Sequence, residues 1–230
     1  MPEITLPNGM PATTFWPEAG HDPGIVLVQE IFGRTAYMRK RAQDLADYGY
    51  CVVLPQIYWR LGEDAIEESS EGALEKAMGL MSQVDWEQAV DDVRATVGAL
   101  RLEPDTDERV ALVGFCFGGG LAYAAAQGAQ RLQGADALIS YYGSALPNLV
   151  DGDPVEVPSL HHFGESDSFI PMETVEHIRE VVTRNEDAEF HTWPGADHAF
   201  DNPAPQFHHA EASEQAWQVT LDWLAEHYPA

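Results

Sequence analysis

The sequence predicts an α/β fold in which a mostly parallel central sheet carries helices on both faces. Short, continuous apolar runs recur along the 230 residues, and amphipathic segments of helical length separate them. Unbroken apolar runs are typical of strands buried on both faces, and strands that alternate with helices form parallel sheets. The length suits one large hydrophobic core, so we expect residues 1–230 to form a single domain.

The N-terminal quarter is expected to form a hairpin and then two strands joined by a helix. Ile4 to Trp16 has the pattern of two short strands around Pro7-Asn8-Gly9, and an Asn-Gly pair is a strong hairpin signal. Gly49 is a typical stop after a helix. The elements expected after the hairpin are a loop over 17–24, a strand over 25–28, a helix over 34–48 and a strand over 51–55.

The rest of the chain continues the alternation of strands and helices. Residues 63–100 have a helical, amphipathic composition, with a break expected at Gly79 and a new start near Asp85. The strands expected after them are 110–113, 137–143, 157–163 and 189–193, and the helices are 118–127, 172–185 and 206–227.

The charge balance excludes several classes of partner. The chain carries 38 acidic and 12 basic residues, for a net charge of −26. Nucleic acids and anionic membrane surfaces need a basic patch to bind, so we expect neither as a partner. The acidic residues cluster in segments that are typical of solvated loops and helix faces.

The sequence also indicates a cytoplasmic protein. No run approaches the roughly 18 apolar residues of a membrane span, and the N-terminus lacks the basic and apolar regions of a signal peptide. The two cysteines, Cys51 and Cys116, are too few for a disulfide framework, and reduced thiols fit that compartment.

The segment from Val110 to Gly120 carries the first signal of catalysis. It reads Val-Ala-Leu-Val-Gly-Phe-Cys-Phe-Gly-Gly-Gly, and its Gly-x-Cys-x-Gly core around Cys116 is a nucleophile-elbow pattern with a thiol as the nucleophile. Glycines are needed there because neighbouring backbone packs too closely at a strand-to-helix turn for side chains. Free cysteines are also common as inert core residues, so this motif alone leaves both interpretations open.

Cys116, Asp167 and His198 each follow the C-terminal end of an expected strand, so the fold brings them to one edge of the sheet. Their order of nucleophile, acid and histidine is that of the α/β-hydrolases. His198 would accept the thiol proton, and Asp167 would orient the imidazole. Asp197 is a weaker candidate for that orienting carboxylate, because side chains adjacent in sequence generally point apart. Asp201, immediately after Phe200, is a further weak alternative.

Other polar residues are further candidates for a site. Glu30 directly follows the strand over 25–28, where parallel sheets place functional carboxylates. The pairs His161-His162 and His208-His209 suggest a metal site. Neighbours on a strand face opposite sides, however, and the second pair lacks an i, i+4 ligand spacing. We therefore expect no metal.

Four segments resemble the dienelactone hydrolase family and cover nearly the whole chain in the right order. They are Gln29-Glu30-Ile31-Phe32-Gly33, Gly114 to Gly119, Gly164 to Pro171, and Gly195-Ala196-Asp197-His198-Ala199-Phe200. The resemblance implies an α/β-hydrolase fold and a Cys116-His198-Asp167 triad that forms an acyl-thioester.

The resemblance also implies the remaining parts of the site. Glu30 would be a fourth member that contacts the resting thiol and helps to activate it. The backbone N–H groups of Ile31 and Phe117 would form the oxyanion hole. No cofactor is implied.

The sequence departs from the family where a substrate carboxylate is bound. Asn202 stands where the best-known members have an arginine, and Leu74 and Met78 align approximately with a second anchoring arginine and tyrosine. Both departures argue against an anionic dienelactone as substrate. Asn202 is a candidate pocket residue, and Arg34 and Arg60 are the cations considered as replacements. The aromatic residues expected to line an apolar substrate pocket are Tyr58, Trp59, Trp86 and Trp193.

We therefore expect a hydrolase of small-molecule esters or lactones, as a monomer or small homo-oligomer. The alternative is a non-catalytic protein that binds a small ligand on the same fold. A thiol-redox protein is disfavoured because no Cys-x-x-Cys pair is present.

The acidic composition leads to the hypothesis that the protein is adapted to high salt. With a net charge of −26, the acidic side chains repel one another at low ionic strength. Salt screens this repulsion, because the Debye length falls to about 3 Å near 1 M salt. We expect the melting temperature to rise between about 0.1 M and 2 M KCl, a range in which surface charges become almost fully screened. Differential scanning calorimetry measures it, and a constant melting temperature would contradict the hypothesis.

Overall fold

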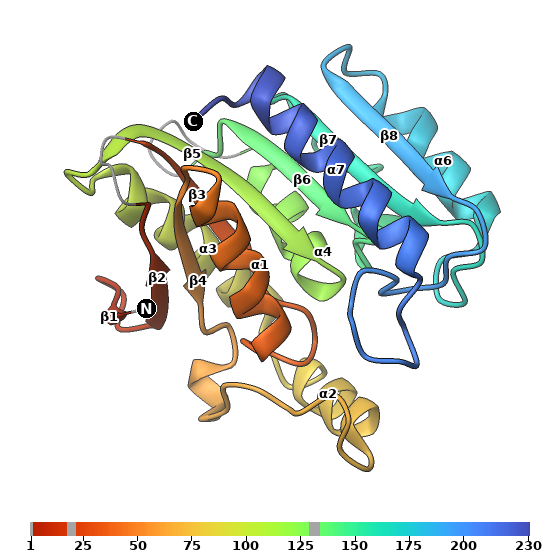
Figure 1. The fold of residues 1–230 in the computed structure, drawn as a ribbon, viewed down its shortest axis with the longest axis horizontal. Coiled ribbons are helices and arrows are strands. Elements are labelled where there is room, and N and C mark those ends of the chain that lie inside the picture. Colours follow the sequence, from red (N-terminus) through yellow and green to blue (C-terminus); the bar gives the residue numbers. More distant parts are fainter. Residues whose placement is uncertain (1, 18–21, 129–133) are drawn as a thin grey trace.

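The computed structural model describes residues 2–17, 22–128 and 134–230, and these form a twisted eight-stranded sheet between two layers of helices (Figure 1). The strand order is β1-β2-β4-β3-β5-β6-β7-β8. The pairs β1/β2 and β2/β4 are antiparallel, and every other neighbouring pair is parallel. The strands are β1 (Glu3–Thr5), β2 (Pro11–Phe15), β3 (Asp22–Val28), β4 (Cys51–Pro55), β5 (Thr106–Phe115), β6 (Ala137–Tyr141), β7 (Ser159–Gly164) and β8 (Ala188–Trp193).

Helices cover both faces of this sheet. Helices α1 and α7 lie on one face, and α3, α4 and α6 lie on the other (Figure 1). The helices are α1 (Ala36–Asp47), α2 (Ala73–Met81), α3 (Trp86–Arg101), α4 (Phe117–Ala126), α5 (Leu146–Leu149), α6 (Met172–Val182) and α7 (Ala210–His227), and a 3-10 turn spans Trp59–Leu61. The predicted α/β fold with helices on both faces is therefore confirmed.

The core sits where the central strands are covered from both sides. Ile25 to Val28 on β3 and Val110 to Val113 on β5 are all fully or almost fully buried. Burying one such aliphatic side chain contributes about 1.5–3 kcal/mol. The unbroken apolar runs thus form the rigid centre of the sheet, and the loops at the carboxyl ends of its strands are built on it.

The structure corrects the predicted helical segment over 63–100. Residues 63–72 form turns and an isolated bridge, and Gly79 lies inside α2. A Cβ at Gly79 would meet no atom within 4 Å, so this exposed helix position tolerates glycine at a cost of about 1 kcal/mol. The break falls instead before Asp85, whose carboxylate accepts a hydrogen bond from the Gln88 N–H and caps α3.

Smaller differences concern element ends. β3 begins at Asp22, inside the expected loop over 17–24, of which residues 18–21 lie outside the described residues. β5 begins at Thr106, four positions before the apolar run, because backbone pairing with β3 extends past the buried segment. The four-residue α5 was not expected, since it is too short to show helical periodicity.

In the described ranges, no helix combines the length and the apolar character needed to cross a membrane.

Candidate active site

The predicted catalytic residues lie together at the carboxyl ends of the parallel strands. Glu30 follows β3, Cys116 lies between β5 and α4, Asp167 follows β7, and His198 follows β8. Because β3, β5, β6, β7 and β8 are consecutive neighbours in the sheet, loops far apart in sequence converge at this edge.

The turn at Cys116 requires the glycines that flank it. Cys116 has φ 55° and ψ −116°, a left-handed conformation that is strained for a residue with a side chain. A Cβ on Gly114 would collide with the backbone of Gly118, and a Cβ on Gly118 would collide with the carbonyl oxygens of Val28 and Gln29. The absence of side chains at these two positions lets β5 turn directly into α4.

A chain of hydrogen bonds joins the thiol, the imidazole and a carboxylate. The Cys116 Sγ lies 3.2 Å from His198 Nε2, and His198 Nδ1 lies 2.8 Å from Asp167 Oδ2. Asp167 is itself fixed, because its Oδ1 accepts the backbone N–H groups of Phe169 (2.8 Å) and Ile170 (2.9 Å). The His198 imidazole therefore lies between the Cys116 thiol and the Asp167 carboxylate, which fixes its orientation.

The two weaker candidates for the orienting carboxylate have other partners. Asp197 Oδ1 accepts the backbone N–H groups of Ser168 and His198, so it shapes the loop. Asp201 is fully enclosed and binds Arg41, the Tyr37 hydroxyl and the Ser213 hydroxyl. Neither contacts the His198 ring among the described residues.

His198 is held in a setting that favours its charged form. Burial alone lowers the pKa of His198, but the nearby Cys116 sulfur as a thiolate and the hydrogen bond to Asp167 outweigh burial and raise it to about 10. An imidazolium at this position stabilises a thiolate 3.2 Å away. The geometry therefore supports proton transfer from Cys116 to His198.

Glu30 is a buried carboxylate held by neutral donors. Its Oε2 accepts the Asn202 side-chain N–H at 2.7 Å, and its Oε1 accepts the Tyr142 hydroxyl at 3.2 Å. Burial raises the pKa of Glu30 to about 7, although the Asn202 hydrogen bond opposes that shift. The contact between Glu30 and the thiol that the family resemblance implied is not among the described hydrogen bonds.

These residues open into a small, mostly apolar cavity of about 230 Å³. Glu30, Cys116 and His198 line it together with Ile31 and Ser144. Neither lysine nor arginine is part of this described lining. The other lining residues are Phe32, Leu74, Met78, Met81, Phe169, Ile170, Ala199 and Phe207.

The oxyanion-hole candidates lie beside the thiol. Ile31 lines the cavity, and Phe117 is the first residue of α4, where backbone N–H groups have no partner within the helix. The N-terminus of α4 also places the positive end of its dipole at Cys116.

The aromatic residues predicted to line the pocket lie behind it. The buried Tyr58 donates its hydroxyl to the Ile31 carbonyl and stacks on Phe117, and Trp86 meets the edge of Phe117. Trp59 donates its indole N–H to Asp92. Tyr58 thus supports one residue of the cavity lining, Ile31, whereas Trp59 and Trp86 are partly buried against the core and make no part of that lining.

Asn202 and Trp193 are also outside the cavity lining. Asn202 is fully buried and serves as the partner of Glu30, and Trp193 donates its indole N–H to His162. Asn202, four residues after His198, thus holds the Glu30 carboxylate and forms no part of the cavity surface.

Neither arginine considered as a replacement cation reaches the cavity. Arg34 is buried among Glu3, Asp64 and Thr13, and Arg60 pairs with Asp92. The apolar replacements Leu74 and Met78 do line the cavity.

Sequence reasoning missed Tyr142, Phe169 and Phe207. Tyr142 directly follows β6 at the same sheet edge as Cys116, which was an available signal. Phe169 and Phe207 lie in loops whose path the sequence does not show. Phe169 packs edge-on against the His198 ring, with ring centroids 5.1 Å apart.

The histidine pairs do not form a metal site within the described parts of the chain. His162 contacts Thr220 on α7, whereas His161 faces the opposite side of the sheet, and His209 accepts the Ala212 N–H at the start of α7. No group of three ligand side chains is placed to hold a metal ion in the described residues.

Comparison with known proteins identifies the family. The model of the dienelactone hydrolase family matches residues 10–228. The chain belongs to the dienelactone hydrolase family. It is 34% identical over 206 residues to the carboxymethylenebutenolidase of Pseudomonas putida, covering 88% of this chain and 85% of the relative. Carboxymethylenebutenolidase 1 of Cupriavidus pinatubonensis is 32% identical over 211 residues, with 91% and 88% covered.

The fold agrees with a solved member of the dienelactone hydrolases. A crystal structure of a Klebsiella pneumoniae protein assigned to them has a TM-score of 0.81 and 28% identity, covering 98% of both chains. The protein is therefore a carboxylic ester hydrolase that acts on ester or lactone bonds, and the non-catalytic alternative is not favoured.

The raised pKa of Glu30 leads to a prediction about stability. A carboxyl whose pKa rises from 4.5 to about 7 on folding binds more protons in the folded state than in the unfolded state between these pH values. The free energy of unfolding therefore falls as pH rises through that range. Each pKa unit corresponds to about 1.4 kcal/mol. We therefore compare the free energy of unfolding of Glu30→Gln with that of the wild type at two pH values. We expect the difference, variant minus wild type, to be about 2–3 kcal/mol larger at pH 8 than at pH 5.

Urea denaturation at both pH values measures this difference in the free energy of unfolding. Glu75→Gln, the same change at an exposed position of α2, controls for the loss of one charge. A stability difference between Glu30→Gln and the wild type that is equal at both pH values would show that the Glu30 pKa is not raised.

Proposed function

We propose that this enzyme cleaves small, neutral esters or lactones through a Cys116 nucleophile, a His198 base and an acyl-thioester intermediate. The observation that carries this proposal is the hydrogen-bonded chain from Cys116 through His198 to Asp167, which opens into the apolar cavity. It places a nucleophile, a base and an orienting carboxylate in the roles that acyl transfer requires.

Acylation begins when His198 Nε2 takes the thiol proton and Cys116 Sγ bonds to the substrate carbonyl carbon. The carbonyl π electrons move to oxygen, and the backbone N–H groups of Ile31 and Phe117 stabilise that oxyanion. Such donors each contribute roughly 10² to 10³ in rate. The oxyanion collapses, the C–O bond breaks, and the imidazolium returns its proton to the leaving alkoxide.

Deacylation repeats these steps with water. His198 takes a proton from water as the water oxygen attacks the thioester carbonyl, and the C–S bond then breaks to release the acid and restore the thiol. Asp167 stabilises the imidazolium in both halves through its 2.8 Å contact with His198 Nδ1.

Glu30 assists through charge. It lines the same cavity as His198, and the attraction between these two groups lowers the pKa of Glu30 against the effect of burial. The same attraction stabilises the imidazolium when Glu30 is ionised. Glu30 thus favours formation of the thiolate, and Asn202 and Tyr142 hold it in place.

The cavity selects against charged substrates. Leu74, Met78 and Phe207 present apolar surface, and the described lining offers no lysine or arginine to a substrate carboxylate. An anionic group would lie near ionised Glu30, and the His198 imidazolium is already paired with Asp167 and the Cys116 sulfur. The anion would therefore lack a counter-charge of its own, which is costly in an apolar site. A volume of about 230 Å³ suits a small acyl or alcohol group.

The first prediction from this mechanism concerns the nucleophile. Cys116→Ala removes the only group that can form the thioester, so we expect hydrolysis of 4-nitrophenyl acetate to fall by roughly 10⁴-fold or more. Release of 4-nitrophenol at 400 nm, about the usual wavelength for this assay, measures the rate. Cys51→Ala is the matched control, because Cys51 is a buried thiol remote from the cavity. Wild-type turnover in Cys116→Ala would refute the mechanism.

The second prediction concerns the pH profile. Because the ionised form of Glu30 is the active one and its pKa is about 7, kcat/KM of the wild type rises as pH increases through 7. We expect Glu30→Gln to lack this rise and to be about tenfold slower at pH 8, the effect of about 1.4 kcal/mol. Glu75→Gln is again the control. An unchanged profile in Glu30→Gln would assign Glu30 a purely structural role.

A further inference from the structure

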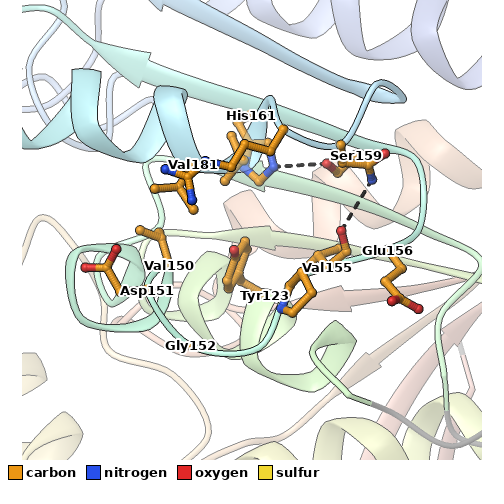
Figure 2. Close-up of a pocket in the computed structure, with 13 residues that line it drawn as sticks. Tyr123, Val150, Asp151, Gly152, Val155, Glu156, Ser159, His161 and Val181 are labelled. Carbon is orange, nitrogen blue, oxygen red and sulfur yellow. Dashed lines mark hydrogen bonds between the residues drawn. The ribbon is translucent and has the colours of Figure 1, made fainter.

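A second, larger cavity lies at the other end of β7 from the catalytic loop. Its volume is about 590 Å³, and its walls come from α4, α6, the start of β7 and the loop over 150–156 that leads into that strand (Figure 2). Tyr123, Val150, Val155 and His161 are among its lining residues. None of the four active-site residues contributes to it.

His161 lies within the wall of this cavity and has an unpaired polar atom, which a ligand reaches once neighbouring side chains shift. The side chain is fully buried, and its Nε2 pairs with the Ser159 hydroxyl at 3.2 Å. Its Nδ1 has no hydrogen-bond partner among the described residues. Buried polar atoms are almost always paired in folded proteins, so an unpaired ring nitrogen at a cavity points to a partner from outside the chain.

Tyr123 supplies a second polar group to the same space. The residue is 2% exposed, and its hydroxyl points into the cavity on the side of His161 (Figure 2). The Tyr123 and His161 ring centroids are 6.1 Å apart. Burial raises the pKa of Tyr123 to about 12, and no hydrogen bond within the described residues contributes to that shift.

Both polar groups are neutral near pH 7, and valine side chains form part of the surrounding wall. Burial lowers the pKa of His161 to about 4, so the imidazole is uncharged. The wall includes Val150, Val155, Val181 and Val182. An ionic head group would lose its hydration among these side chains without a buried counter-charge, because Arg184 is exposed at the rim.

A hydroxyl group fits the two polar atoms. It can accept a hydrogen bond from the Tyr123 phenol and donate one to His161 Nδ1, or reverse these roles if the imidazole takes its other tautomer. The charged residues Asp151, Glu156 and Arg184 are exposed at the rim, and because two are acidic and one is basic, the rim does not attract an anion.

The geometry points to a second ligand site: this cavity binds a small neutral molecule with an apolar ring and a hydroxyl group that pairs with Tyr123 and His161. The site is separate from the ester-hydrolysing centre, which lies at the carboxyl edge of the sheet. Its volume is within the range of about 300–1,000 Å³ that is typical of small-molecule pockets.

The test compares three probes that share one ring system. 2-Naphthol carries the neutral hydroxyl, naphthalene lacks it, and 2-naphthoate replaces it with a charge. We expect saturable binding of 2-naphthol by isothermal titration calorimetry, weaker binding of naphthalene, and no binding of 2-naphthoate at this cavity. The imidazole ¹⁵N resonances of His161 are expected to shift as 2-naphthol saturates the protein.

Two substitutions locate the binding. Tyr123→Phe removes one hydrogen bond and is expected to weaken 2-naphthol binding about fivefold while leaving naphthalene binding unchanged. Val182→Trp fills the cavity and is expected to remove the binding of both. Tyr48→Phe, the same change at an exposed tyrosine, is the matched control. Unchanged ester hydrolysis in Tyr123→Phe shows that the fold is intact.

Three results would overturn the proposal. They are no saturable binding of 2-naphthol, equal affinity in Tyr123→Phe, Val182→Trp and the wild type, or unchanged His161 ¹⁵N resonances at saturation. The last measurement uses the unmodified protein and decides the matter even if a variant fails to fold.

Discussion

The close approach of two backbone segments at the Cys116 turn is the constraint on which the active site depends. β5 can pass directly into α4 only because Gly114 and Gly118 carry no side chain. The strained Cys116 is held by its own backbone, whose N–H donates to the Tyr141 carbonyl and whose carbonyl accepts from Gly120 and Ser144. These bonds join Cys116 to β6 and α4, so the rigid sheet offsets the strain and fixes the thiol against His198.

The second constraint is the unbalanced charge behind the thiol. Glu30 and Asp201 are both buried carboxylates, but Arg41 pairs with Asp201, whereas the hydrogen-bond donors to Glu30 among the described residues are the neutral side chains of Asn202 and Tyr142. A cation in place of Asn202 would keep Glu30 ionised at every physiological pH. The neutral amide instead leaves the pKa near 7, so that the charge of Glu30 depends on its surroundings.

Much of the fold, and the placement of Cys116, Asp167 and His198 side by side, could be predicted because they rest on local patterns. Apolar runs mark buried strands, and the residue after each strand lies at a known edge of the sheet. Side-chain direction is a tertiary property, and there prediction failed. Tyr58 follows its strand as expected, yet its hydroxyl is drawn to the Ile31 carbonyl, and Asn202 turns toward Glu30 and away from the cavity. Phe169 and Phe207 line the cavity because of the path of their loops, which is likewise a tertiary property.

The negative charge of the protein and the apolar cavity both favour entry of a neutral ester and release of the anionic acid in the proposed reaction. A neutral ester enters the cavity without opposing the field of a chain with net charge −26. Hydrolysis turns it into a carboxylate, formed beside Glu30 in a described lining without lysine or arginine. Coulomb repulsion in such a low-dielectric site is large and favours release of the acid. The absence of an anchoring cation thus reduces affinity for anionic substrates and promotes product release from the same surface.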